Sequence, residues 1–470
     1  MTGFTVNDNG DGTDFTPGNG ICETATGNGI CTLRAAAVEA NNLAGDDTIS
    51  FAPGVTLITL TSGAEIPITT NIAVNGPGAN VLTVDGGAGN NRIFFISGST
   101  VRVSGMTLQN GNGVGAGTNF KGSAIYITGG AVTLDRLLVQ NNSGASSGIP
   151  DADGTVHITG GTNHVISNST FTNNTARDGG GILAFNSGTI QVFNTTVSGN
   201  TANGGGVPLG GGILVANSTM TIRSSTVTGN SATGGSGFGG GGIYAQAATI
   251  SIGNTIVSGN TSAVQPEIDS AFASVTTSAG FNLIGDSAGD AADSTIAIAY
   301  LPSDILDTPA GLGPLANNGG TTPTRALLGG SPALDKGNSF GNTTDQRGLL
   351  RPFDLAAITN AAGGDGADIG AFEAQSVPTA ARVSISGKVI VGKGSGLRNA
   401  AVVLTDEQGN SRTVRTGTFG YFSFDEVEAG QTYIIAVQSK SYQFAPQVVS
   451  VQENVTDLDF YALAEGSSAK

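Results

Sequence analysis

A repeated seven-residue motif is the feature that most limits how this chain can fold. Four copies lie between residues 168 and 260, beginning at Asn168, Asn194, Ser224 and Asn254. The steps between them are 26, 30 and 30 residues (168 to 194, 194 to 224 and 224 to 254), and a glycine run followed by an aliphatic residue precedes each of the later copies. A repeat of this length is typical of a solenoid, in which each repeat packs on the next.

Inside each repeat, two apolar residues lie two positions apart with a polar residue between them. Ile190 and Val192 are one such pair, and Met220 and Ile222 are another. This alternation indicates a strand with one buried face, and no helical period occurs in these units. We therefore predict an all-β fold, a right-handed parallel β-helix with three short strands per turn. At one repeat per turn, residues 49 to 375 would form roughly eleven coils.

Asparagines recur at one turn of the repeat, at Asn174, Asn200, Asn230 and Asn260. They could form a ligand-binding row. We favour an asparagine ladder, in which the side chains tolerate left-handed backbone and bond turn backbone from coil to coil. The glycine runs are expected at tight turns with positive φ.

The charge balance limits the partners of the chain. The net charge is −16, and only 11% of the residues are charged. A nucleic-acid partner is excluded on this basis, because neutralising phosphates requires clustered Lys and Arg. No stretch reaches the length needed to span a membrane.

Two cysteines, Cys22 and Cys31, lie nine positions apart in a loop rich in Gly, Asn and Thr. Their even number and closeness predict one local disulfide and an oxidising compartment, although a pair of free thiols is the alternative. We therefore expect a secreted or cell-surface protein. No signal peptide is visible, and we expect a mature protein whose leader has been removed.

Residues 1–48 are predicted to form a cap on the first coil. Thr32 is placed to N-cap a short helix over residues 33–40, whose Leu and Ala side chains would cover the open end. The segment Cys31-Thr32-Leu33-Arg34-Ala35-Ala36 resembles the CSLREA motif that precedes bacterial surface β-helices, with two of its six positions changed.

The cap also contains a candidate calcium loop. Asn7, Asn9 and Asp11 occupy positions one, three and five, and Gly12 occupies position six, as in an EF-hand. Gly18 stands at position twelve, where an EF-hand has Glu, so an ordinary polar turn is the alternative. No other cofactor is expected.

Residues 49–309 are predicted to form the repeats of the β-helix. Over roughly residues 100–260 they resemble the polymorphic outer-membrane protein repeat, which pairs a Gly-Gly-x-aliphatic element with Phe-x-x-Asn. Phe171-Thr172-Asn173-Asn174 matches that second element.

Residues 310–374 are predicted to close the β-helix. They resemble the C-terminal part of the choice-of-anchor Q family in four ordered motifs, beginning at Gly313, Gly330, Asp345 and Asp368. The resemblance implies a secreted or surface-anchored β-helix with no defined chemistry. Asp345, Arg347, Asp368 and Glu373 are expected to form ion pairs within this segment, with a catalytic cluster as the alternative.

A linker at residues 375–381 leads into a second domain at residues 382–463. Strand-like runs at short spacing predict a small β-sandwich. Ile385-Ser386-Gly387-Lys388-Val389 and Gly420-Tyr421-Phe422-Ser423-Phe424 resemble the carboxypeptidase regulatory-like domain, an accessory sandwich that brings no peptidase.

An active site is not apparent in the repeats. Cleavage of polysaccharides requires paired carboxylates, or carboxylates with calcium and a base. Between Thr155 and Pro266 the sequence contains one acidic residue, Asp178. His164 occupies the same inward-facing position of its repeat as Ile190, so we expect it in the core and not at a catalytic site. No catalytic residue is predicted, although loop acids could form a site: Asp151, Asp153, Asp286 and Asp304.

An outward row of large side chains is the main functional prediction. The members of this stripe alternate with inward aliphatic residues: Tyr126, His157, Leu183, Phe185, Leu214 and Tyr244. An exposed apolar stripe would bind sugar rings or another protein, whereas long loops or the sandwich could instead cover it. A second row, of Thr and Ser at 170/172, 196/198 and 226/228, resembles the flat arrays of ice-binding solenoids or simply reflects the preference of Thr for strands.

Together these features predict a non-catalytic structural or adhesion protein, secreted or on the cell surface. Its partners would be surface glycans or proteins, or further copies of itself in an oligomer or filament. The alternative is a polysaccharide lyase or glycoside hydrolase of the β-helix type.

Overall fold

The computed structural model describes residues 2–87, 92–113, 120–144, 154–204, 208–233, 239–272, 274–288, 298–375, 382–392, 394–406, 410–428, 431–451 and 454–463. The chain divides into two compact units, residues 1–377 and 378–470. Residues 376–381 of the predicted linker lie outside the described residues.

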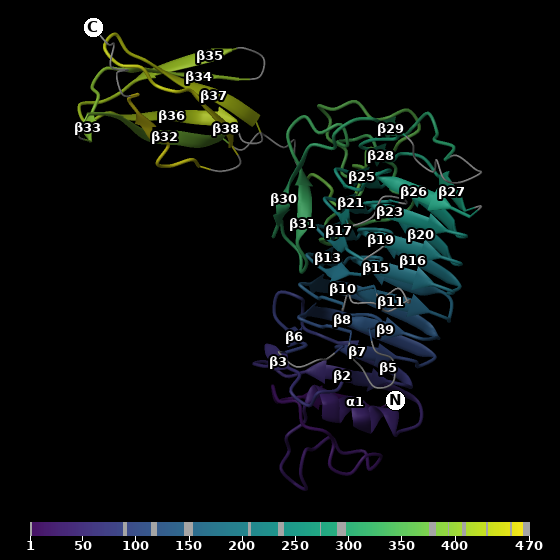
Figure 1. Cartoon of the computed structure of the whole chain (residues 1–470). Helices are drawn as coiled ribbons and strands as arrows, with labels where there is room; N and C mark the ends of the chain where they lie inside the picture. Colours follow the sequence, from purple (N-terminus) through teal and green to yellow (C-terminus); the bar gives the residue numbers. More distant parts are fainter. Residues whose placement is uncertain are drawn as a thin grey trace. The chain divides into compact units, whose positions relative to one another are not determined.

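The first unit is a parallel β-helix, as predicted (Figure 1). Its larger sheet, here the first sheet, joins strands that pair in parallel from coil to coil. They are β1 (Gly3–Val6), β2 (Asp46–Phe51), β3 (Leu57–Thr59), β5 (Asn71–Asn75), β6 (Thr83–Asp85), β8 (Thr100–Gln109), β10 (Ala131–Gln140), β12 (His164–Ser167), β13 (Thr170–Thr172), β16 (Thr189–Phe193), β17 (Thr196–Ser198), β20 (Thr219–Arg223), β21 (Thr226–Thr228), β24 (Thr249–Gly253), β25 (Ile256–Ser258), β27 (Val275–Ser278), β28 (Leu283–Ile284) and β29 (Ile305–Leu306).

The second sheet forms another face of the same coils. Its strands are β4 (Ile66–Ile68), β7 (Phe94–Ile96), β9 (Ile125–Ile127), β11 (Val156–Thr159), β15 (Ile182–Phe185), β19 (Ile213–Ala216), β23 (Ile243–Gln246) and β26 (Ile268–Ala271). A third, narrow sheet follows the motif, with β14 (Thr175–Ala176), β18 (Thr201–Ala202) and β22 (Ser231–Ala232).

The number of turns is smaller than the sequence predicted. In the described residues, the second sheet has 8 strands in parallel register, and these bound about seven complete turns. The expectation of roughly eleven was too high, in part because it counted residues 310–374 as coils. At about 4.8 Å per turn, seven turns span about 34 Å.

Like residues stack on like inside the coils, and this stacking forms one continuous apolar core. His164 is aligned with Ile190 in that core and is buried, as expected. Its Nδ1 accepts from the Val132 amide at 3.3 Å, so Nε2 carries the proton and donates to the Gly160 carbonyl at 3.1 Å. Burial lowers the pKa of His164, and the ring stays neutral.

The first coil is covered by helix α1 (Leu33–Asn41), confirming the predicted helix and its cap. The Thr32 hydroxyl accepts from the Ala35 amide at 3.0 Å, which satisfies one of the free donors at the helix start. Cys22 and Cys31 form a disulfide in the preceding loop. Strand β1 pairs with β2, so the first sheet already begins within residues 1–48.

Residues 310–374 lie along one side of the coils. They contain the hairpin β30 (Leu312–Ala316) and β31 (Thr324–Leu327), beside β13, β17 and β21 in Figure 1. An apolar cluster outside the coils joins the segment to the solenoid through Ile256, Leu327 and Ile369. We call residues 310–374 the side strap.

The second unit consists of two sheets around a separate apolar core, as predicted for a sandwich. One sheet contains β32 (Arg382–Val391), β33 (Ser395–Gly396), β36 (Tyr421–Glu428) and β39 (Phe460–Tyr461). The other contains β34 (Ala401–Thr405), β35 (Ser411–Arg415), β37 (Gln431–Gln438) and β38 (Gln447–Val451).

Candidate functional site

The predicted binding stripe is not an exposed surface. Its members do align in register on the outside of the second sheet. All are buried except Phe185, which is 38% exposed. For the other five, the exposed alternative is therefore wrong, and the second alternative, cover within the chain, applies: Tyr126, His157, Leu183, Leu214 and Tyr244.

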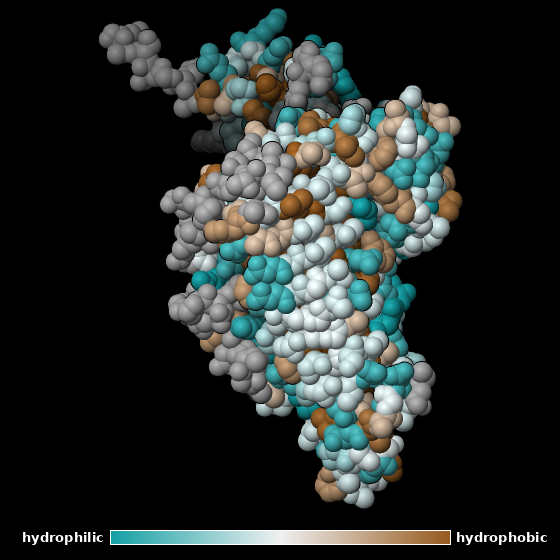
Figure 2. Space-filling model, turned by 90° about the vertical axis from the view of Figure 1, so that its right-hand side faces the viewer, coloured by the Kyte–Doolittle hydropathy of each residue, from teal (hydrophilic) through white to brown (hydrophobic). Residues whose placement is uncertain are grey.

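The glycine turns provide part of the cover over this stripe. Leu183, Leu214, Tyr244 and Ala271 form an apolar cluster against which Leu209 packs. Gly179 has φ +58°, and a Cβ there would lie 2.9 Å from the Leu183 Cβ, so the turn lies directly on the stripe. Farther down, the Tyr126 ring meets the His157 ring edge-on at 5.2 Å. Figure 2 shows one face of the solenoid, which is mostly pale with scattered brown residues.

The Thr row on the first sheet is also covered. The Thr170 hydroxyl donates to the Pro323 carbonyl at 2.6 Å, and Thr196 Oγ1 donates to Gln346 Oε1 at 2.6 Å. Thr226 Oγ1 accepts from the Ala371 amide at 3.0 Å. Since the side strap lies over these hydroxyls, they do not form the exposed flat array that ice binding requires.

The recurring asparagines form a continuous hydrogen-bonded ladder. Nδ2 of Asn174, Asn200 and Asn230 donates to Oδ1 of the next member at 2.9 Å. Each Oδ1 also accepts the backbone amide of the preceding member. The ladder prediction is confirmed, but the left-handed backbone belongs to neighbours such as Asn173 and Gly199.

Two members of the ladder were not recognised in the sequence. Asn142 begins it, donating to Asn174 Oδ1 at 2.9 Å. Glu267 ends it, accepting from Asn260 Nδ2 at 2.6 Å and from the Gly259 amide at 2.7 Å. Burial raises the pKa of Glu267, and the hydrogen bonds from Asn260 and Gly259 partly offset this by lowering it. The signal for Asn142 was its spacing of 32 residues from Asn174, whereas Glu267 lies just beyond the last repeat.

The four predicted residues Asp345, Arg347, Asp368 and Glu373, together with Arg351, form a buried polar cluster in the side strap, here called the lock. Arg347 pairs with Asp345 at 2.7 Å, and Arg351 Nε donates to Glu373 Oε2 at 2.7 Å. Asp368 accepts from the Asp335 and Ala374 amides at 2.8 and 2.6 Å. Ion pairs are thus found for Asp345, Arg347 and Glu373, as expected, whereas Asp368 is held by backbone amides.

Burial governs the protonation of this lock. Asp345, Asp368 and Glu373 are all fully buried. Burial, aided by the charge of Glu373, raises the pKa of Asp368 to about 7, and burial also raises the pKa of Glu373. Raised carboxyl pKa values suit general acids, but a dissolved substrate does not reach groups closed off in this way.

The remaining acids of the coils are engaged with the fold. Asp178 accepts from the Leu209 amide at 2.9 Å, and Asp269 from the Gly239 amide at 2.9 Å. Asp304 accepts four hydrogen bonds and Asp286 accepts one, from Ala288. The other two loop candidates, Asp151 and Asp153, lie outside the described residues.

The oxygens of Asn7 and Asp11, two of the three candidate calcium ligands, already have partners. Asp11 accepts from Arg34 Nε at 2.7 Å and from the Thr61 and Ser62 amides at 2.8 Å. Asn7 is bonded to Gly29 and Cys31, and Asn9 is exposed. No group of three or more His, Cys, Asp or Glu residues that could hold a metal occurs in the described part of the chain. Calcium binding here stays a prediction, and it would require Asp11 to release its donors.

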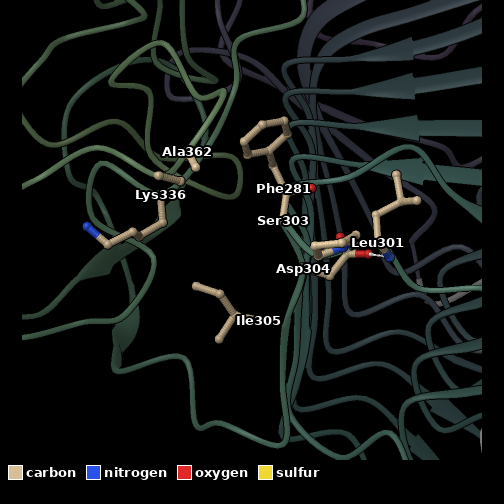
Figure 3. Close-up of a pocket in the computed structure, with 9 residues that line it drawn as sticks. Phe281, Leu301, Ser303, Asp304, Ile305, Lys336 and Ala362 are labelled. Carbon is tan, nitrogen blue, oxygen red and sulfur yellow. Dashed lines mark hydrogen bonds between the residues drawn. The ribbon is translucent and has the colours of Figure 1, made fainter.

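A hollow of about 440 Å³ opens where the last coils meet the side strap. Figure 3 shows Phe281 and Ile305 on the side of the coils and Lys336 and Ala362 on the side of the strap. Asp304 lines the hollow too, and its Oδ2 accepts from the Leu301 amide at 2.7 Å. Lys336 Nζ donates to the Thr359 carbonyl.

The ring of Phe340 continues this surface beyond the hollow, next to Phe281. The Phe281 and Phe340 rings meet edge-on with centroids 6.2 Å apart, and the Arg223 guanidinium lies 5.0 Å from the Phe340 ring. Both phenylalanines have positive φ, 58° and 48°, which is rare for a bulky residue and costs on the order of 1–3 kcal/mol each. We call the hollow and these two rings the end hollow.

Two family models match the chain. The right-handed beta helix region matches residues 91–289, and the carboxypeptidase regulatory-like domain matches residues 384–462. The side strap lies outside both ranges, and its more specific resemblance stays a proposal. A search of curated proteins found no match.

A membrane-spanning helix is not found among the described residues, where none is both long and apolar enough. The larger unit thus carries a right-handed β-helix region, and the smaller one a carboxypeptidase regulatory-like domain. Both domain types are common in extracellular proteins, and the chain fits a surface or secreted protein.

Proposed function

We propose that the protein is a non-catalytic adhesion module, secreted or on a cell surface, that binds a glycan at the end hollow. One observation carries the proposal. The carboxylates described between residues 155 and 288 all accept hydrogen bonds from the chain itself, while Phe340 at the end hollow is 41% exposed.

The chemistry of the end hollow suits the apolar face of a sugar ring. Phe281 and Phe340 supply aromatic rings on a backbone whose strained conformation the surrounding packing holds in place. Both oxygens of Asp304 are engaged in bonds to the chain, which favours orientation of a ligand over proton transfer.

The test is a polysaccharide panel on which retention and cleavage are scored separately. We expect the full chain to be retained by at least one neutral polysaccharide without release of new reducing ends. Phe281→Ala and Phe340→Ala should each weaken retention by about tenfold, since one aromatic contact contributes roughly 1–1.5 kcal/mol.

Phe419→Ala is the matched control, because Phe419 is 74% exposed but lies in the other unit. Equal retention of all variants would place the binding surface elsewhere. Release of reducing ends would instead favour the lyase or hydrolase alternative.

Self-association is a second part of the proposal, and it is supported by an edge strand. Strand β38 pairs on one side with β37, and the described residues place no strand on its other side. It carries no charge, and Val448 is 70% exposed. Uncharged, unpaired edges are where another chain can add a strand.

A further inference from the structure

A second hollow, in the sandwich, has a charge opposite to that of the rest of the chain. Its volume is about 610 Å³, within the range that holds a small ligand. Three of its lining side chains are cationic, Arg398, Arg415 and Lys440, and none is acidic. We call it the basic hollow.

The fold positions these cations at one end of one sheet. Arg415 on β35 lies opposite Ala401 on β34, which lies opposite Gln438 on β37. Arg398 comes just before β34, and Lys440 just after β37. The three side chains therefore come from three separate segments and meet at one hollow.

None of these cations is neutralised by the described part of the chain. No carboxylate lies within ion-pair distance of Arg398, Arg415 or Lys440 among the described residues. Arg415 Nη1 donates to the Asn399 carbonyl at 3.1 Å, which restricts the guanidinium without cancelling its charge. All three residues are exposed and can meet a ligand.

The charges of the two units make this local excess unusual. Residues 378–470 contain 8 basic and 9 acidic residues, a net charge of −1, whereas residues 1–377 contain 11 and 26, a net charge of −15. Unpaired positive charge is therefore concentrated where the acidic background is weakest.

The net negative charge of the chain favours a ligand whose own negative charges are widely spaced. A nucleic acid carries one charge per about 1.7 Å and would bring many unmatched phosphates to an acidic chain. A polysaccharide with one carboxylate per sugar brings few, and arginine forks match carboxylates well. Asn399, Ser439 and Ser441 add neutral partners for sugar hydroxyls.

We propose that the basic hollow binds an acidic polysaccharide through its carboxylates, held by Arg398, Arg415 and Lys440. This site does not depend on the end hollow. It gives the sandwich a recognition role of its own, selective for charge.

The experiment measures retention of the full chain on immobilised polygalacturonate, with dextran sulfate, neutral dextran and duplex DNA in parallel. We expect retention on polygalacturonate that high salt abolishes. The triple variant Arg398→Gln/Arg415→Gln/Lys440→Gln should bind about tenfold more weakly, since each exposed pair contributes a fraction of a kcal/mol.

Two further variants keep the test decisive. Arg398→Gln/Lys440→Gln retains the bond between Arg415 and Asn399, so its loss of binding does not reflect a disturbed sheet. Arg412→Gln removes an exposed cation of the same strand outside the hollow and should bind within about twofold of wild type.

Several results would overturn the proposal. These are no retention on polygalacturonate, equal retention of the triple variant, or an equal loss in Arg412→Gln. Preference for dextran sulfate would overturn the assignment to carboxylates, and equal retention on DNA would overturn selection of a polysaccharide. Failure of the end hollow would appear separately, as unchanged binding of neutral polysaccharide in Phe281→Ala.

Discussion

The solenoid and the sandwich use their polar side chains in opposite ways. Among the described residues of the first unit, seven arginines form ion pairs: Arg34, Arg92, Arg102, Arg136, Arg177, Arg347 and Arg351. In the described part of the sandwich no ion pair occurs, and Arg398, Arg415 and Lys440 face solvent.

This difference has a physical origin. Parallel coils bury one side of every turn, so polar groups at the turns must find partners within the chain or lose stability. A small sandwich buries one face of each sheet and leaves the outer faces and ends in water. Polar residues in the solenoid therefore mainly stabilise its fold, whereas those of the sandwich are exposed and can contact ligands.

The first way to test this comparison is to break the lock of the side strap. Arg351→Met should lower the free energy of unfolding of the solenoid by about 3–5 kcal/mol, because it leaves the buried Glu373 carboxylate without its cation. Urea unfolding followed by circular dichroism measures the loss.

The double variant Arg351→Met/Glu373→Leu is the control. It should lose less than the single variant, because no buried charge is left alone. A loss below about 1 kcal/mol in Arg351→Met would show that the pair does not stabilise the strap.

The second test addresses the ladder. Asn200→Ala should cost about 2–4 kcal/mol, because it removes the acceptor of the buried Asn174 backbone amide and a donor to the Phe171 carbonyl. Asn203→Ala, an exposed change three residues further, should stay within about 0.5 kcal/mol of wild type. Similar losses in both variants would contradict a specific role for the ladder.

The third test uses pH and has a smaller expected effect. Burial lowers the pKa of His164 below its ordinary value of 6.5, so as the pH falls through about 6.5 the unfolded chain gains a proton that the folded chain does not. Stability is lost on acidification, and His164→Ile, which copies its neighbour Ile190, should reduce that loss.

The measurement is the difference in unfolding free energy between wild type and variant from pH 7 to pH 5. Taking this difference removes the opposing contribution of Asp368, whose pKa is raised to about 7 and whose contribution to stability declines as pH rises. An unchanged slope in His164→Ile would show that the ring does not titrate differently in the two states.

The smallest effect on stability is expected at the free edge of the sandwich. Val448→Lys should change the unfolding free energy by less than about 0.5 kcal/mol and reduce self-association at high protein concentration. Light scattering over a concentration series measures the association. A wild-type monomer at every concentration would remove β38 from consideration as a contact.

The parts of the fold that repeat were predictable from the sequence. The ladder, the stacked core and the inward position of His164 each recur at a fixed spacing, so a local pattern determines them. The cap helix was also predictable, because Thr32 and the Ala run that follows it act through local hydrogen bonds and packing.

The parts that depend on distant contacts were not predictable. The stripe residues have the register of outward side chains, and their burial comes from loops and turns such as that of Gly179. The path of the side strap rests on bonds such as Gln346 to Thr170, which are 176 residues apart. The two hollows likewise arise from segments whose proximity no local pattern indicates.

The side strap also bears on how the molecule comes apart. A solenoid whose turns contact only their neighbours unravels one turn at a time from an end. Here Thr322, Gln346 and Asn342 bond to the turns at Asn168, Thr196 and Ser224, and Gly370 to the turn at Asn254. Those four coils are all hydrogen-bonded to the side strap. They should therefore open together and leave no partly unwound form for a protease to cut.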